Sequence, residues 1–143
     1  MRRSSRGSAL IEFALVLPFL VTLLFGTIDG ARAFSTWNRV KNGAREGAEF
    51  AQYFPLRQKP NAGVCAAPNN VEDRAKQEGS DLTVTVTPTG SPTCQDLVPG
   101  STLQSGQNVT VTVSAPFSFV TPIAGALWKN TTVKASVTVT VQG

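Results

Sequence analysis

The chain begins with a long apolar run. From Ser8 to Ile28 there are 21 residues, and Glu12 is the one charged residue among them. At about 1.5 Å per residue, a helix of this length extends for about 31 Å, which matches the hydrocarbon thickness of a bilayer. The pattern predicts a transmembrane helix over residues 8–28.

A second helical pattern follows the apolar run. Small and apolar residues recur every three or four positions and so lie on one stripe of a helix: Ala33, Trp37, Val40, Ala44, Gly47, Ala51 and Phe54. This narrow stripe suits close packing against a helix or a sheet. We expect it to pack on the C-terminal part of this chain, and packing on another subunit is the alternative. One helix over residues 8–54 would extend for about 70 Å, with a kink at Pro18.

The pattern changes to alternation in the rest of the chain. Residues 55–68 form a predicted loop, and Asn70 is a candidate N-cap for a short helix over Val71 to Glu78. Apolar residues then alternate with Thr, Ser or Lys in three runs, at 82–87, 109–113 and 133–141. These runs predict an antiparallel sheet with one apolar face that needs a cover. The expected fold class is α+β, with the long N-terminal helix packed on a small C-terminal antiparallel sheet.

An apolar connection, Ala115 to Trp128, joins the second and third of these strands. Pro116 and Pro122 interrupt it, and it is too short and irregular to span a membrane. We expect its large side chains to fill the space between the sheet and the helix: Phe117, Phe119, Ile123, Leu127 and Trp128. The alternative is a contact surface, centred on Phe117, Phe119 and Trp128, for another subunit, the membrane surface or a host ligand.

Charge argues against nucleic acid as a partner and predicts an orientation in the membrane. The formal net charge is +4, but three of the 13 basic residues, Arg2, Arg3 and Arg6, precede the apolar run, and ten basic and nine acidic residues remain after it begins. No basic patch for a phosphate backbone is therefore expected. The early arginines predict a cytoplasmic N-terminus and an extracytoplasmic C-terminus by the positive-inside rule.

The composition also argues against catalysis. The chain of 143 residues contains no histidine and two cysteines, so it lacks the commonest general base and a Cys/His zinc site. No catalytic motif and no nucleophile paired with a base occurs in the sequence. We therefore predict neither an enzyme nor a metal or other cofactor, and we look for a role in assembly or recognition.

Cys65 and Cys94 are both predicted to lie outside the cytoplasm, where disulfide bonds persist. We predict a bond between them, and two free buried thiols are the alternative. The bond would close a loop of about 30 residues and stabilise a small domain by about 3–4 kcal/mol.

A secretory signal peptide is the alternative to a retained membrane helix. Ala31-Arg32-Ala33 resembles a signal-peptide cleavage site, and Phe13 to Ile28 has nearly the length of a signal-peptide core. Glu12 argues against a signal peptide, because a carboxyl group costs about 2.5–3.5 kcal/mol at the bilayer centre and less nearer the interface. Cleavage after Gly7 would place a new amine on Ser8, four residues before Glu12, where the two charges can neutralise each other.

These residues resemble the class III signal of type IV pilins and pseudopilins, in which a prepilin peptidase cuts after glycine and the fifth mature residue is glutamate. Counted from Ser8, Glu12 is fifth and Phe13 is sixth. The short leader and the Glu-Phe pair look like the Tad (Flp) subgroup. The segment from Asn38 to Ala51 is similar to the Asn-x-Val-x-x-Ala-Ala-Arg-x-Gly-Ala pattern of TadE-like proteins, with Gly43 in place of the first alanine.

The resemblance implies a pilin-like subunit, either a minor pilin or a pseudopilin, of a Tad-type adhesion pilus. It implies that Gly7 is the peptidase recognition residue, Ser8 the new N-terminus, Glu12 the charge that registers subunits, and Phe13 its apolar neighbour. The chain would divide into a leader (1–7), a membrane and packing helix (8–54) and an extracytoplasmic α+β domain (55–143).

Partners and location follow from the same resemblance. The implied partners are other pilins or pseudopilins, the pilus assembly platform, the prepilin peptidase, and membrane lipid around residues 8–28. The implied location is the bacterial cytoplasmic (inner) membrane, or the extracellular pilus after assembly. The alternative function is a secreted or membrane-tethered binding module, in which the threonine-rich face of the sheet recognises a carbohydrate or a protein.

Overall fold

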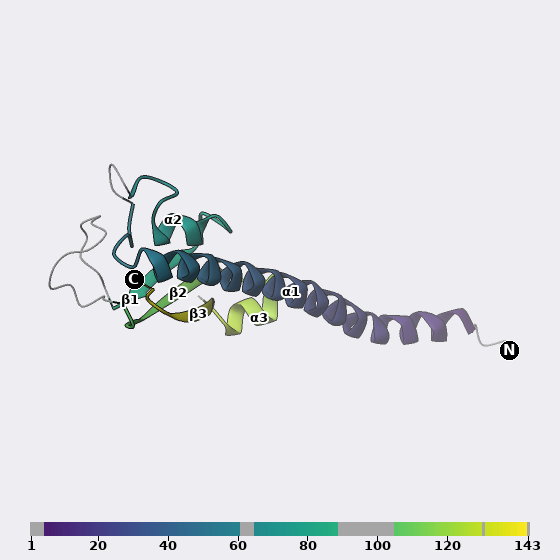
Figure 1. Ribbon diagram of the computed structural model, residues 1–143. Helices are drawn as coiled ribbons and strands as arrows, with labels where there is room; N and C mark the ends of the chain where they lie inside the picture. Colours follow the sequence, from purple (N-terminus) through teal and green to yellow (C-terminus); the bar gives the residue numbers. More distant parts are fainter. Residues whose placement is uncertain (1–4, 61–64, 89–104, 130, 143) are drawn as a thin grey trace.

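The computed structural model describes residues 5–60, 65–88, 105–129 and 131–142. Its first element, α1 (Ser5–Tyr53), is one helix of 49 residues. The later elements are α2 (Val71–Lys76), β1 (Thr83–Thr87), β2 (Asn108–Phe117), α3 (Pro122–Leu127) and β3 (Thr131–Thr140). Figure 1 shows that these elements gather around the C-terminal half of α1, while its N-terminal half stands bare.

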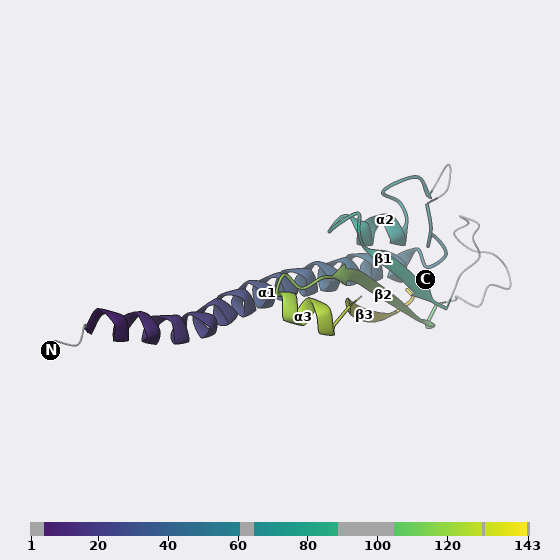
Figure 2. The ribbon, with the colours of Figure 1, turned by 180° about the vertical axis from the view of Figure 1, so that it is seen from behind.

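The long helix passes through Pro18 without ending. Proline has no N–H to donate to the carbonyl group four residues earlier, and this loosens the helix locally. The hydroxyl of Thr22 donates to the Pro18 carbonyl at 2.8 Å. The axis of α1 bends within its N-terminal, purple part (Figures 1 and 2), as a proline inside a helix leads one to expect.

The three strands form an antiparallel sheet in the order β1-β2-β3. Their apolar residues face each other across the ladder, with Val111 paired to Val86 on one side and to Val137 on the other. On the opposite face, the hydroxyls of Thr110 and Thr138 lie 2.8 Å apart and hydrogen bond to each other. The α+β fold predicted from the sequence is confirmed.

The apolar face of the sheet and the inner face of α2 both pack on α1. The core contains small and branched residues from these elements, together with Leu82 just before β1: Val40, Ala44, Ala48, Ala51, Val71, Ala75, Leu82, Val109, Val111 and Val113. Four residues of the predicted stripe are buried here, namely Val40, Ala44, Gly47 and Ala51.

Two large residues of the predicted stripe, one towards each end, do not reach this core. Trp37 is 42% exposed and Phe54 is 38% exposed. The ammonium group of Lys41 lies 4.8 Å from the centre of the Trp37 ring, and the Phe54 ring lies against Phe50 at 5.2 Å. Helical spacing places both residues on the stripe. The sheet and α2, however, cover the stripe only from Val40 to Ala51.

The N-cap predicted for α2 is present. The side-chain oxygen of Asn70 accepts a hydrogen bond from the Asp73 N–H at 2.7 Å, and its amide donates to the Cys65 carbonyl at 3.0 Å. The helix ends at Lys76, two residues earlier than predicted. Residues 77 and 78 continue as a turn, and the Glu78 carbonyl accepts a hydrogen bond from Arg39 of α1 at 3.1 Å.

The connection between β2 and β3 contains a short helix, α3, that the sequence did not predict. Phe117 is buried and Phe119 is half-buried, but Leu127 is 69% exposed and Trp128 is 59% exposed. The prediction that Leu127 and Trp128 fill the core is wrong, because the valine rows of the sheet already fill the space against α1 and the end of α3 lies outside it. The side chain of Ile123 lies outside the described part of the chain.

Candidate functional site

The N-terminal half of α1 carries the residues predicted for processing and assembly. Gly7, Ser8, Glu12 and Phe13 lie in its first turns and are exposed. The Ser8 hydroxyl donates to the Glu12 carboxylate at 3.3 Å. Ser8 and Glu12 therefore share one face of the helix, and an amine created on Ser8 would lie close to the carboxylate.

The bare half of α1 has the surface expected of a membrane span. Within the described residues, one helix is long and apolar enough to cross a bilayer, and the most apolar part of it is not buried in the structure. Large side chains point outward there, with Leu10, Leu15, Phe19 and Leu23 each 66–72% exposed. A continuous apolar surface of this kind is rare on soluble proteins, and it fits the hydrocarbon layer of a bilayer.

Asp29 joins this bare half to the folded domain. It is 6% exposed, although it comes directly after the apolar run. Its carboxylate accepts hydrogen bonds from the Val120 N–H at 2.8 Å, the Thr121 N–H at 2.9 Å and the Thr121 hydroxyl at 2.5 Å. The Thr121 hydroxyl and the Val120 N–H hold the pKa of Asp29 below its ordinary value of 3.8, against the opposing effect of burial.

Arg32, one turn further along α1, holds the same segment. It donates to the Ser118 carbonyl at 3.0 Å, and its guanidinium lies 5.7 Å from the centre of the Phe117 ring. The same group lies 3.6 Å from the Asp29 carboxylate. Asp29 and Arg32 were not predicted as site residues, because no local pattern links them to partners more than 80 positions away.

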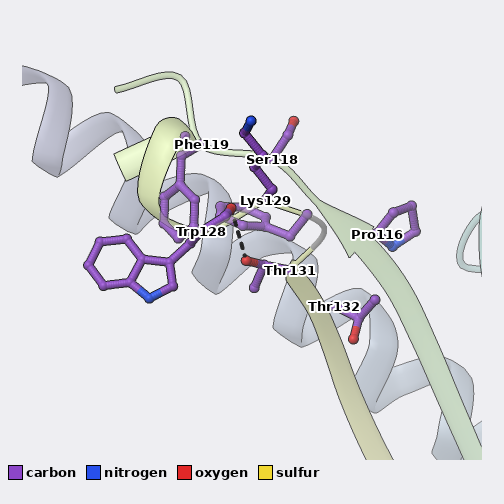
Figure 3. A pocket seen from close by; sticks show the side chains of 9 residues that line it. Pro116, Ser118, Phe119, Trp128, Lys129, Thr131 and Thr132 are labelled. Carbon is purple, nitrogen blue, oxygen red and sulfur yellow. Dashed lines mark hydrogen bonds between the residues drawn. The ribbon is translucent and has the colours of Figure 1, made fainter. Parts of the chain in front are cut away.

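A hollow of about 560 Å³ lies beside α3, at the ends of β2 and β3. Figure 3 shows the side chains that line it, including Phe119, Trp128, Lys129 and Thr131. No carboxylate stands among its lining residues. Across the described ranges, no cluster of three or more His, Cys, Asp or Glu residues could hold a metal ion.

Cys65 is fully buried, and no cysteine in the described ranges is free. Cys94 lies outside the described residues. The Cys65–Cys94 bond therefore stays a prediction.

Comparison with protein-family models gives a match. A family model described as TadE-like protein matches residues 7–49, which are nearly the whole of α1. The match confirms the resemblance that was predicted from the Gly7–Phe13 and Asn38–Ala51 motifs. No curated protein and no solved structure matches the chain.

Proposed function

Because residues 7–49 of this chain are TadE-like, we propose that the protein is a pilin-like subunit of a Tad-type adhesion pilus. It acts as a minor pilin or pseudopilin. A prepilin peptidase cleaves it after Gly7, and residues 8–28 anchor it in the cytoplasmic membrane with the N-terminus inside and the domain outside. The processed chain consists of the helix at 8–54 and the domain at 55–143.

The continuity of α1 carries this proposal. One helix contains both the apolar half and the packing half, and Asp29 and Arg32 bind the segment that precedes α3. Both residues precede Ala33. Signal-peptide cleavage after Ala33 would therefore remove side chains that the folded domain uses, whereas cleavage after Gly7 leaves every described contact of the domain in place.

Glu12 has a role in assembly under this proposal. An exposed carboxylate in the apolar segment is costly in a bilayer, and the Ser8 hydroxyl that now faces it is a weak partner. After cleavage, the α-amine of Ser8 on the same or a neighbouring subunit neutralises the charge. Subunits are thereby held in register, with Phe13 packing beside the pair.

The partners proposed are other pilins or pseudopilins, the assembly platform, the peptidase and membrane lipid. The alternative function as a carbohydrate- or protein-binding module gains no support from the threonine face. Hydroxyls on two of its strands bond to each other, in the pairs Thr110–Thr138 and Thr112–Ser136. No residue is assigned a catalytic role.

Top-down mass spectrometry of the protein isolated from its own cells tests the proposal, with Glu12→Ala and Glu49→Ala variants alongside. We expect a chain that begins at Ser8 in all three. Glu12→Ala should be absent from sheared pili, and Glu49→Ala, which also removes an exposed charge but outside the apolar segment, should be present at the wild-type level. A chain that begins at Phe34 would overturn the proposal.

A further inference from the structure

The α3 segment carries an exposed apolar patch next to the bare half of α1. We define the α3 patch as Val120, Leu127 and Trp128, which are 47%, 69% and 59% exposed. Phe119 lies between the patch and the buried Phe117. Its ring centre is 6.0 Å from that of Trp128 and 5.1 Å from that of Phe117. Figure 3 shows the Trp128 indole on the outer side of Phe119, directed away from the strands.

The hydrogen bonds of Asp29 and Arg32 fix the level of this patch along α1. Thr121 bonds to Asp29, one residue beyond the predicted end of the apolar span, and Ser118 bonds to Arg32, four residues beyond it. At 1.5 Å per residue, these levels lie about 1.5 and about 6 Å outside the hydrocarbon. The headgroup layer on each side of a bilayer is about 5–8 Å thick, so the start of α3 lies at the depth of this layer.

The overall arrangement agrees with this level. In Figures 1 and 2, α3 is the labelled element that lies nearest to the bare half of α1, and the sheet and α2 lie further away. The patch thus lies on the element nearest to the apolar half of α1.

The chemistry of the segment also suits a membrane interface. Lys129 is the one charged residue between Ala115 and Thr131, and no acid occurs there. Arg32, 45% exposed at its side chain, adds a second cation beside Ser118 of the same segment. Tryptophan beside a cation is typical of membrane interfaces, where the ring lies among the headgroups and the charge meets lipid phosphate.

We propose that the α3 patch docks on the outer surface of the membrane, with Trp128 and Leu127 inserted among the lipid headgroups and Lys129 facing lipid phosphate. This inference rests on the proposed membrane span. It makes the chain a two-point membrane protein: α1 crosses the bilayer, and α3 lies on it and sets the tilt of the domain.

Tryptophan quenching in the full-length protein tests this docking, because the chain has two tryptophans. Trp37→Phe leaves Trp128 as the probe. Trp128→Phe leaves Trp37, which is exposed but lies nine residues beyond the span, about 13 Å outside the hydrocarbon. The protein is reconstituted in phosphatidylcholine–phosphatidylglycerol vesicles whose acyl chains carry bromine either near the headgroups or near the bilayer centre. A third variant, Leu20→Trp with both native tryptophans changed to Phe, reports on the span itself.

Strong quenching of Trp128 by bromine near the headgroups, with a blue-shifted emission and weak quenching by aqueous acrylamide, is the expected result. Trp37 should be quenched weakly by bromine and strongly by acrylamide, without a blue-shifted emission. The Leu20→Trp probe should be quenched by bromine at the bilayer centre. If Leu20→Trp is quenched and Trp128 behaves like Trp37, the docking is wrong while the span holds. Trp128 shielded from both quenchers would indicate a protein neighbour and would also overturn the docking. If Leu20→Trp is not quenched, both the span and the docking are wrong.

Discussion

Gly43 stands where the TadE-like pattern has an alanine, and the packing of α2 explains the exchange. A Cβ atom at this position would lie 2.7 Å from the backbone carbonyl oxygen of Ala75 and 3.3 Å from a methyl group of Leu82. The oxygen belongs to the backbone of α2, so it cannot turn aside as a side chain would. The glycine therefore permits α1 and α2 to approach closely at this point.

Gly43→Ala should destabilise the domain despite the better helix propensity of alanine. In an exposed helix, the change from glycine to alanine gains about 0.5–1 kcal/mol, whereas overpacking a filled core costs about 1–3 kcal/mol. We expect a net loss of about 1 kcal/mol in the free energy of unfolding, measured by denaturation of the detergent-solubilised protein. Gly30→Ala is the control, because a Cβ there meets nothing within 4 Å and should leave stability unchanged or raised. Equal stability of Gly43→Ala and wild type would contradict the packing argument.

At the scale of the elements, the α3 segment depends on Asp29. The hydrogen bonds from Thr121 and Val120 keep the pKa of Asp29 below 3.8. A carboxyl with a depressed folded pKa stabilises the fold at pH values above its unfolded pKa, and this contribution is lost as the pH falls through the folded value. The hydrogen bonds that hold the α3 segment on α1 should therefore be fully formed at neutral pH. They should weaken only below about pH 3.8.

Acid titration followed by the fluorescence of Trp128, in the Trp37→Phe variant, measures this effect in detergent. The Trp37→Phe variant, which keeps Asp29, should show a reversible change in Trp128 emission below pH 3.8. Asp29→Asn should show the low-pH emission already at neutral pH, and the emission should not change further over the same range. If the change in emission persists unaltered in Asp29→Asn, the titration of another group causes it.

The elements with a regular period could be predicted from the sequence, and those held by distant contacts could not. The valines of residues 109–113 alternate with threonines, and the pleat of a strand turns that alternation into one buried face. The core positions of α1 from Val40 to Ala51 follow from the helical period in the same way. By contrast, α3 is six residues long, and its position depends on bonds to Asp29 across about 90 residues. The exposure of Trp37 and Trp128 likewise depends on how far the domain extends along α1, which spacing does not encode.

At the scale of the whole molecule, the single helix α1 joins its bare apolar half to the folded domain. The helix enters the core at Val40, and the C-terminal segment returns to its far end, where the Gln142 N–H donates to the Gln52 carbonyl at 2.8 Å. The domain is thus fixed at both ends of the packing half of α1. A change in the direction of α1 between Pro18 and Val40 would therefore move the domain with it.

Within the folded domain, the predicted Cys65–Cys94 bond has its effect at the start of α2. Cys65 is buried, and its carbonyl accepts the hydrogen bond from the N-cap residue Asn70, so a constraint at Cys65 acts directly on the start of α2. We expect the native protein to be lighter by two hydrogen atoms than its reduced form in intact-mass measurements, with no thiol available for alkylation before reduction.

Cys65→Ser and Cys94→Ser should each lower the free energy of unfolding by about 3–4 kcal/mol. The free energy of unfolding of the double variant should be little lower than that of either single variant, because the two single variants and the double variant all lack the same bond. Two thiols that alkylate without reductant, or losses that add in the double variant, would show that the cysteines act separately.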